Sequence, residues 1–420
     1  MRVILVAALL SMTAGPMLEA GETWPQFRGP DGQGISDAKG VPVEWNESKN
    51  VKWKTPIRGR AWSSPVIWHD QVWLTTATED GKELSILKIE RATGKILLDK
   101  VVFEIAKPQF CYPFNSYASS TPAIEEGRIY VHYGSHGTAC LDTATGETLW
   151  TRQDLPCNHH RGAGSSPILF GDLVFINFDG YDLQYVVALD KATGQTVWKQ
   201  DRDIDYGTSD GDAKKSYGTP LVIEVGGKPL LVSPAAGGTT AYDPLSGKIV
   251  WRLRHGGMNA AAPPLFGHGL LFLNTADGGF RELAVPPEGK GDITANVLWK
   301  QQQAMPSRCA PLLVGDLLFM TNEAGILTCL EATTGNVVWR ERLGGHYSAS
   351  PVYADGHVYF VSEDGELPVI AAGRKYELLA TNKLDEGCMA SPAIAGREIF
   401  IRTKKSLYCI EQSPSSPGTP

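Results

Sequence analysis

The densest run of residues capable of chemistry is Cys157-Asn158-His159-His160-Arg161. Cysteine and histidine are zinc ligands, but adjacent histidines in an extended segment point to opposite sides, and no partner follows at a standard ligand spacing. We therefore expect His159, His160 and Arg161 to contact a ligand or to order their own loop, with zinc as the alternative. The guanidinium of Arg161 would pair with a carboxylate or an anionic ligand.

An acidic run between Asp201 and Asp212 is the second candidate. Asp201, Asp203 and Asp205 alternate as in a calcium-binding loop, but the glycine comes one position late, and the run ends on Asp212 where such loops have glutamate. These three alternating carboxylates are the candidate calcium ligands. The alternative is a solvated loop whose charge is neutralised by the lysines that follow, including Lys215.

The cysteines fall into two groups. Cys111 and Cys157 each precede a proline-initiated strand by ten or eleven residues, so a disulfide between them could form in an oxidising compartment. Two free thiols are the alternative. Cys140, Cys329 and Cys409 each stand two residues before an acidic residue, where other copies of the same pattern have alanine. We expect these three to be small buried core residues.

Several classes of function are disfavoured by the sequence. No Gly-x-Ser-x-Gly elbow, His-Glu-x-x-His pair or phosphate-binding loop occurs, so we predict no catalytic residue. The net charge of −7 and the lack of a basic block argue against nucleic acid as a partner. With 42% hydrophobic and 20% charged residues, the 420-residue chain has the composition of a soluble globular protein.

The N-terminus has the features of a secretory signal. Arg2 provides the positive charge, and the apolar run from Val3 to Ala14 is too short to span a bilayer. We predict cleavage after Ala20 and no integral membrane segment. The mature protein should be exported and soluble, in the periplasm or outside the cell.

The elements that must position these residues come from a repeat. A small residue, a proline and an apolar run recur along the chain, with the prolines 40 to 57 residues apart. A turn and a second apolar run follow each copy, which is typical of a hairpin whose first strand begins with proline. The eight copies are Ser64-Pro65, Thr121-Pro122, Ser166-Pro167, Thr219-Pro220, Pro263-Pro264, Ala310-Pro311, Ser350-Pro351 and Ser391-Pro392.

A second pattern follows most of these hairpins and reads Asp-x-x-Thr-Gly-x-x-x-Trp. Asp142 to Trp150 and Asp190 to Trp198 are complete copies. The acid and the glycine predict a tight turn, and the alternation after it places the tryptophan on the buried face of an outer strand. We expect six tryptophans to dock between repeats: Trp53, Trp150, Trp198, Trp251, Trp299 and Trp339.

Four short strands in each unit of 40 to 50 residues predict a β-propeller. We therefore predict an all-β fold, an eight-bladed propeller of four-stranded antiparallel blades. The last unit lacks its tryptophan strand, and the segment around Trp53 supplies one, so the N-terminal strand should complete the last blade. The predicted divisions are a signal peptide (1–20), an N-terminal extension (21–50), the propeller (51–412) and a flexible tail (413–420).

These repeats resemble the pyrroloquinoline quinone (PQQ) repeat family of eight-bladed propellers over about residues 45–412. The Asp-x-x-Thr-Gly-x-x-x-Trp element is similar to that family's tryptophan docking motif, in which the indole stacks on the neighbouring blade. Exported PQQ-like repeat proteins also carry a segment like Trp24-Pro25-Gln26-Phe27-Arg28-Gly29-Pro30. The family includes PQQ-dependent dehydrogenases and the BamB-like exported proteins, among them non-catalytic scaffolds.

The resemblance leaves two functions open. The chain lacks the adjacent cysteines, the Cys-x-x-Cys-His haem motif and the long insertions of the dehydrogenases, and it also lacks the lipobox cysteine of BamB. We predict an exported, BamB-like, non-catalytic propeller that binds protein, peptide or carbohydrate as a monomer, with no cofactor. The alternative is an alcohol or aldehyde oxidoreductase dependent on PQQ and calcium.

Ligand or partner contacts are expected from the loops over the funnel of the propeller, where the repeats are longest. The two longest insertions precede Pro122 and Pro220. Aromatic and polar residues on loops over a rigid scaffold suit recognition. The predicted contact residues are Tyr112, Asn115, Tyr117, His159, His160, Arg161, Tyr206, Asp210, Asp212 and Lys215.

Overall fold

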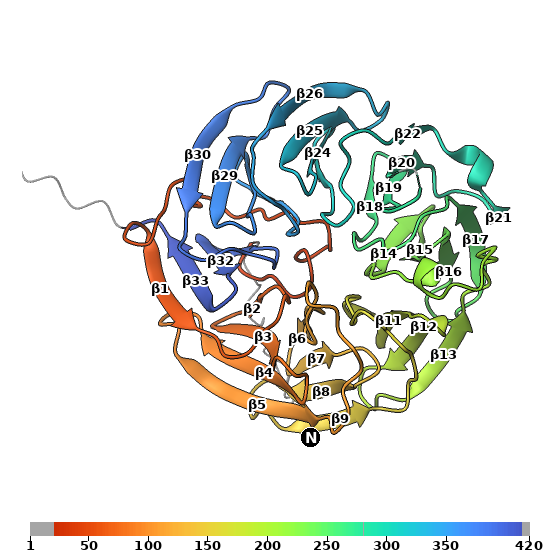
Figure 1. Cartoon of the computed structure of the whole chain (residues 1–420), viewed down its shortest axis with the longest axis horizontal. Coiled ribbons are helices and arrows are strands. Elements are labelled where there is room, and N and C mark those ends of the chain that lie inside the picture. Colours follow the sequence, from red (N-terminus) through yellow and green to blue (C-terminus); the bar gives the residue numbers. More distant parts are fainter. Residues whose placement is uncertain (1–20, 280, 414–420) are drawn as a thin grey trace, which may run out of the picture.

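Eight β-sheets stand around a central axis in the computed structural model, which describes residues 21–279 and 281–413 (Figure 1). The predicted signal peptide (1–20) and all but the first residue of the predicted tail (413–420) lie outside the described residues. The prediction of an eight-bladed propeller of antiparallel blades is confirmed. Among the described residues no helix is long and apolar enough to cross a membrane.

Blades 1 to 4 follow one another along the chain, each running from its innermost to its outermost strand. Blade 1 contains β2 (Val66–Trp68), β3 (Gln71–Ala77), β4 (Glu83–Glu90) and β5 (Ile96–Glu104). Blade 2 contains β6 (Ala123–Glu125), β7 (Arg128–His132), β8 (Thr138–Asp142) and β9 (Thr148–Arg152). Blade 3 contains β10 (Ile168–Phe170), β11 (Leu173–Asp179), β12 (Gln184–Asp190) and β13 (Thr196–Asp201). Blade 4 contains β14 (Leu221–Val225), β15 (Lys228–Pro234), β16 (Gly238–Tyr242) and β17 (Ile249–Arg254), after the 3-10 helix η1 (Asp212–Lys214).

Blades 5 to 8 complete the ring. Blade 5 contains β18 (Leu265–Gly267), β19 (Leu270–Asn274), β20 (Glu282–Val285) and β22 (Trp299–Gln301), with β21 (Gly291–Asp292) and the 3-10 helix η2 (Thr294–Asn296) between the last two. Blade 6 contains β23 (Leu312–Val314), β24 (Leu317–Thr321), β25 (Ile326–Glu331) and β26 (Val337–Arg342). Blade 7 contains β27 (Val352–Ala354), β28 (His357–Tyr359), β29 (Glu366–Ala371) and β30 (Leu378–Lys383). Blade 8 contains β31 (Ala393–Ala395), β32 (Glu398–Arg402), β33 (Ser406–Glu411) and β1 (Val51–Pro56).

The N-terminal strand closes the ring as predicted. β1 pairs antiparallel with β33, and Trp53 lies opposite Cys409. The Lys52 ammonium adds ion pairs to Glu398 at 2.6 Å and Glu411 at 3.0 Å. Strands from the two ends of the chain therefore share one blade, and β33 is paired on both sides instead of being left as a free outer edge.

Blade 4 differs from the others because it carries a fifth strand. β21, which comes from the connection within blade 5, pairs in parallel with β17, and Gly291 lies opposite Trp251. Blade 5 has no Thr-Gly turn at this point of the repeat, so its longer connection is free to run along the neighbouring edge. One outer edge of the ring is thus covered by the chain itself.

The six docking tryptophans connect blades 2 to 6 and blade 8 to the blade that follows each. The Trp150 indole N–H donates to the Lys191 carbonyl at 2.9 Å, and a Cβ added to Gly194 would lie 2.6 Å from the Trp150 ring. Trp198 donates in the same way to Pro244 O at 2.9 Å. The turn glycine is therefore required twice, for its positive φ and because the indole of the preceding blade lies against it.

The small residue two positions before each motif acid also has a structural reason. Cys140 lies directly opposite Trp150 across the β8–β9 pair, and Cys329 lies opposite Trp339. Ala188 takes the same position opposite Trp198. All three small side chains are buried. A larger residue would displace the indole, so the expectation that Cys140, Cys329 and Cys409 are core residues is confirmed.

Hydroxyl groups of the residues before the motif prolines accept hydrogen bonds that join the innermost strands of adjacent blades. The Ser64 N–H donates to Thr121 Oγ1 and the Thr121 N–H donates to Ser166 Oγ, both at 2.9 Å. The Ser350 N–H donates to Ser391 Oγ at 2.9 Å. A proline has no N–H to donate, so the residue before it provides the link to the next blade.

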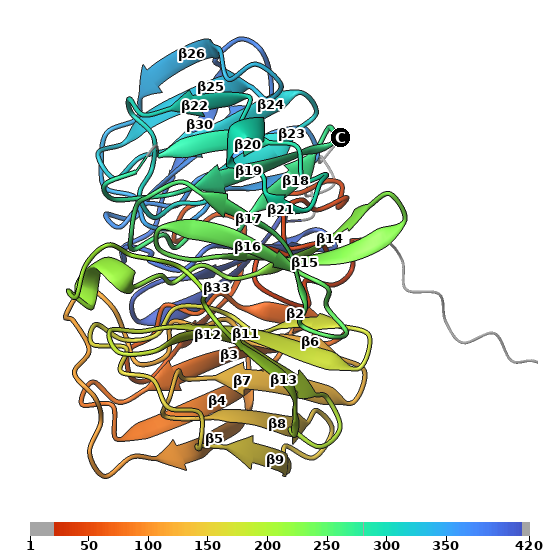
Figure 2. The same cartoon turned by 90° about the vertical axis from the view of Figure 1, so that its right-hand side faces the viewer.

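The segment of residues 24–36, which we call the strap, crosses one end of the central channel. Trp24 pairs with Ile67 of blade 1, and Gly34 accepts a hydrogen bond from the Tyr353 N–H of blade 7. Figure 1 shows the red strap in the middle of the ring. The long loops, with η1 as a short yellow-green coil, project from the opposite face in the side view of Figure 2. We call that face the loop face.

Candidate functional site

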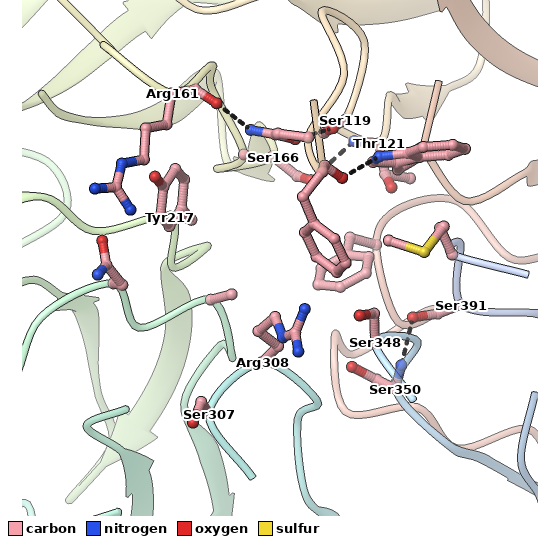
Figure 3. A pocket seen from close by; sticks show the side chains of 18 of the residues that line it. Ser119, Thr121, Arg161, Ser166, Tyr217, Ser307, Arg308, Ser348, Ser350 and Ser391 are labelled. Carbon is pink, nitrogen blue, oxygen red and sulfur yellow. Dashed lines mark hydrogen bonds between the residues drawn. The ribbon is translucent and has the colours of Figure 1, made fainter. Parts of the chain in front are cut away.

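A cavity of about 540 Å³ occupies the centre of the loop face (Figure 3). It lies within the range of small-molecule binding sites. The residues just before the innermost strands form its wall, and Phe27 of the strap lies at its base. Its other lining residues are Trp62, Ser64, Tyr112, Phe114, Asn115, Ser119, Thr121, Arg161, Gly164, Ser166, Tyr217, Asn259, Ala261, Asp277, Ser307, Arg308, Glu323, Ser348, Ser350, Met389 and Ser391.

One wall contains Tyr112, Asn115 and Arg161, which the sequence singled out in two different loops, and Asp212 of a third loop supports it from outside the lining. Arg161 donates to Asp212 Oδ2 at 2.6 Å and lies over the Tyr112 ring, with its guanidinium carbon 5.7 Å from the ring centre. Asn115 donates to the carbonyl of Arg161 at 3.0 Å. The predicted contact residues Tyr112, Asn115, Arg161 and Asp212 are therefore brought together.

Lys215 supports this wall from behind. Its side chain is fully buried, and its ammonium donates to the Tyr217 hydroxyl at 2.7 Å and lies 3.4 Å from Asp212 Oδ1. Burial lowers the pKa of Lys215 to about 8, although the Asp212 carboxylate opposes that shift. The lysine is not in the lining of the cavity, so its role in the geometry is to hold Tyr217 and Asp212 in place.

The opposite wall contains residues that the sequence did not single out. Glu323 accepts hydrogen bonds from the backbone N–H groups of Ser307 and Arg308 at 2.7 and 2.9 Å. Arg308 lies over the Phe114 ring at 4.4 Å, and its Nε lies 3.7 Å from Glu323. Phe114 belongs to the loop before blade 2, so that loop extends over the funnel as far as blade 6.

The remaining predicted contact residues lie outside the cavity lining. The Tyr117 hydroxyl donates to the Gln109 carbonyl at 2.8 Å. His159 is buried, accepts from the Ser135 N–H at 3.1 Å, and has its pKa lowered to about 4 by burial. Tyr206 lines a neighbouring cavity of about 400 Å³, and Asp210 accepts from the Asp212 N–H at 3.0 Å. In this geometry these residues hold their own loops or line a second hollow.

Three exposed aromatic side chains and a histidine form a patch beside the cavity. We call Phe110, Tyr112, His160 and Tyr181 the aromatic patch. The His160 ring lies 6.0 Å from Phe110 and 5.1 Å from Tyr181. Phe110 is 58% exposed, Tyr112 50% and Tyr181 40%. Grouped aromatic side chains on a surface are typical of a protein contact.

The candidate calcium ligands do not gather. Asp203 pairs with Arg252 at 2.5 Å, Asp201 lies 3.6 Å from the Lys199 ammonium, and Asp205 accepts from the Gly207 N–H. In the described part of the chain, no group of three or more histidine, cysteine or acidic residues could hold a metal ion. The acidic run is a loop whose carboxylates each have their own partner.

The disulfide considered for Cys111 and Cys157 is not formed. All seven cysteines are free thiols. Cys111 Sγ lies 3.8 Å from the Arg161 carbonyl, whereas Cys157 Sγ is buried beside the Leu183 carbonyl at 3.6 Å. The two loops contact each other through hydrogen bonds, such as that of Gln109 to the Cys157 carbonyl at 3.0 Å, and not through a disulfide.

Comparison with known proteins gives one family and one fold. The family described as "Outer membrane protein assembly factor BamB" matches residues 104–184 and 182–416. The BamB of Legionella pneumophila is 27% identical over 49% of this chain and 50% of its own length, so the match spans about half of that relative. BamB from Moraxella catarrhalis has the same fold, with a TM-score of 0.61 at 12% identity over 86% of this chain and 99% of its own.

A quinoprotein is also among the relatives. The quinoprotein ethanol dehydrogenase of Pseudomonas putida is 32% identical over 36% of this chain and 26% of its own length. The cavity does not fit a quinone cofactor held with calcium. Its arginines already face Asp212 and Glu323, and among the described residues no acidic group gathers to hold a cation.

Proposed function

The chain belongs to the family of outer membrane protein assembly factor BamB, and from this we propose that it is a non-catalytic scaffold that binds a partner protein during outer membrane protein assembly. The compartment we propose is the periplasm, reached through the signal peptide predicted at residues 1–20. We further propose that the propeller spans residues 51–412 and acts as a monomer.

The aromatic patch carries this proposal. Phe110, Tyr112 and Tyr181 come from loops on two neighbouring blades, and they present exposed rings on one sector of the loop face. Rigid aromatic side chains give much of the binding energy of protein interfaces, because they bury a large area with few rotatable bonds. Their loops are held by hydrogen bonds such as that of Gln109 to the Cys157 carbonyl at 3.0 Å. We infer a surface that is already formed before the partner binds.

The test is capture of partners from the envelope fraction of the organism that produces the protein. The bait is the mature chain, and the variant is a Phe110→Ala, Tyr181→Ala double substitution. Leu245→Ala is the matched control, because Leu245 is 64% exposed in a turn at the opposite face. We expect an outer membrane protein or another assembly protein to be captured by the wild type and the control and lost with the double variant. Equal capture by all three proteins would contradict the proposal.

The second candidate is the PQQ-dependent oxidoreductase, which the partial likeness to a quinoprotein ethanol dehydrogenase favours. A titration with PQQ and calcium, read as a rise in melting temperature, distinguishes the two. A saturable rise together with dye-linked oxidation of an alcohol would replace the scaffold proposal. No rise, where a known quinoprotein responds, supports the scaffold.

A further inference from the structure

The strap crosses the base of the central cavity, so the loop face is the side from which we expect a ligand to enter. Phe27 lies at the base, and the neighbouring Arg28 is buried, with its guanidinium donating to the Pro311, Pro351 and Gln33 carbonyls at 2.8 to 3.2 Å. These bonds join the strap to blades 6 and 7. They hold the strap across the base of the cavity, whose volume of about 540 Å³ suits a ligand of limited size.

The wall of the cavity contains polar atoms that lack protein partners. Ser64 is 1% exposed, and its Oγ has no hydrogen-bond partner in the described residues. The side-chain oxygen of Asn259 is likewise buried and unpartnered there. Both residues line the cavity. Buried polar groups are almost always satisfied, so these two atoms indicate a ligand that brings hydroxyl groups.

The charges of the lining balance in number, because it contains two arginines, Arg161 and Arg308, and two acidic residues, Asp277 and Glu323. Arg161 lies 2.6 Å from Asp212, and Arg308 lies 3.7 Å from Glu323. An anion would have to compete with these carboxylates, and a free peptide terminus would bring an unpaired charge into the cavity. The lining therefore favours a neutral ligand.

The apolar part of the lining is mostly aromatic, with Ala261 and Met389 as its other apolar side chains. Trp62, Tyr112, Phe114 and Tyr217 line the cavity together with a series of serine and threonine hydroxyls. Figure 3 shows several of these hydroxyls, including those of Ser119 and Ser391, around the same space as Arg161 and Arg308. A molecule with apolar C–H faces and hydroxyl edges matches both parts of this lining.

We propose that this cavity binds a neutral saccharide, with pyranose faces against the aromatic rings and ligand hydroxyls bonded to Ser64 Oγ and the Asn259 side-chain oxygen. The site is separate from the protein contact at the aromatic patch, apart from Tyr112, which belongs to both. A failure of the scaffold proposal would leave this site standing, because it rests on the cavity alone.

The direct test is isothermal titration of the mature chain with four neutral disaccharides: maltose, cellobiose, lactose and N,N′-diacetylchitobiose. We expect saturable binding of at least one of them, with a dissociation constant near or below about 1 mM. No saturable binding of any of the four would overturn the proposal.

Matched variants locate the site. We expect Phe114→Ala to weaken binding at least about tenfold, a change of about 1.4 kcal/mol. Leu183→Ala is its control, since both side chains are 39% exposed on the loop face and Leu183 does not line the cavity. Retained affinity in Phe114→Ala, or equal loss in the control, would overturn the proposal.

Substitution of the two residues with unpartnered atoms gives a second test. We expect Ser64→Ala to weaken binding several-fold, while Ser120→Ala leaves it unchanged, because Ser120 Oγ is also buried and unpartnered but lies outside the lining. Asn259→Gly gives an independent variant that the local backbone accepts, since Asn259 has φ 60°. Unchanged affinity in both Ser64→Ala and Asn259→Gly would overturn the assignment.

Discussion

The docking tryptophans differ in whether the indole N–H has a hydrogen-bond partner, and two conservative substitutions can measure what this difference contributes to stability. The Trp198 indole donates a hydrogen bond to the Pro244 carbonyl at 2.9 Å. Trp251 is fully buried, and its indole N–H has no partner within residues 21–279 and 281–413. Blade 5 lacks the Thr-Gly turn whose carbonyl would accept that bond. We therefore predict that Trp198→Phe destabilises the protein more than Trp251→Phe.

The magnitude follows from the bonds gained and lost. Replacing either indole by phenyl removes similar volume, so the cavity terms nearly cancel in the comparison. Trp198→Phe also loses a hydrogen bond with a net value of about 0.5–1.5 kcal/mol. Trp251→Phe instead removes an unsatisfied buried donor, which relieves about 1–3 kcal/mol. We expect Trp251→Phe to be less destabilising than Trp198→Phe by about 1.5–4.5 kcal/mol, whereas Trp198→Ala should cost about 3–5 kcal/mol.

The assay is equilibrium unfolding in urea, followed by circular dichroism, with the midpoints compared at equal slope. Trp339→Phe is the matched control, since its indole donates to the Gly373 carbonyl at 3.1 Å, and it should behave like Trp198→Phe. An equal fall of the urea midpoint in Trp251→Phe, Trp198→Phe and Trp339→Phe would show that the indole hydrogen bond does not set the difference in stability.

Three further predictions concern a glycine, a carboxyl group and the thiols. Gly194→Ala should lower the melting temperature much more than Gly226→Ala. Both glycines have positive φ, but a Cβ at Gly194 would meet the Trp150 ring, whereas Gly226 faces open space. An equal fall in melting temperature would show that contact with the indole is not the cause. Burial raises the pKa of Glu282 to about 8, so its folded form holds a proton that the unfolded chain loses near its ordinary pKa of 4.5. The free energy of unfolding of the wild type should therefore fall as the pH rises from about 4.5 to about 8. Measured in urea, the free energy of unfolding of Glu282→Gln should increase relative to that of the wild type over the same interval. A difference between the two proteins that does not change with pH would refute this prediction. Alkylation of the native protein should modify Cys111 before the other six cysteines, because those six are buried. The reaction at Cys111 should still be slow, since desolvation raises the pKa of its thiol to about 11. The intact mass should not change on reduction, and a change in mass would reveal a disulfide.

The fold could be predicted because its signals are local. Asp142 accepts hydrogen bonds from the N–H groups of Ala144 and Thr145, and Gly146 follows at positive φ. Such a turn is specified by residues that are neighbours in the sequence. Repetition of the pattern at regular intervals then indicated the number of blades.

The site could be predicted only on the side where the loops are long. Tyr112, Arg161 and Asp212 stood out because they lie in insertions and polar clusters. Arg308 and Glu323 lie in short connections with no such signal, and their place beside Phe114 depends on the curvature of the whole ring.

The contacts of the strap could not be predicted because their partners are far away in the sequence. Arg28 donates to carbonyls of Pro311 and Pro351, which lie 283 and 323 residues away in the sequence. No local pattern around Arg28 specifies such partners. The calcium and disulfide hypotheses used spacing alone, and spacing did not show that Asp203 has Arg252 beside it.

Photo-crosslinking from the loop face, in the compartment where the protein acts, is the most direct test of the proposed scaffold function. A benzoylphenylalanine at Phe110 is compared with one at Leu245, an exposed residue of the opposite face. We expect a crosslink from position 110 to an outer membrane protein or another assembly protein, and none from position 245. No crosslink from position 110, or the same products from both positions, would contradict a scaffold that binds its partner through the aromatic patch.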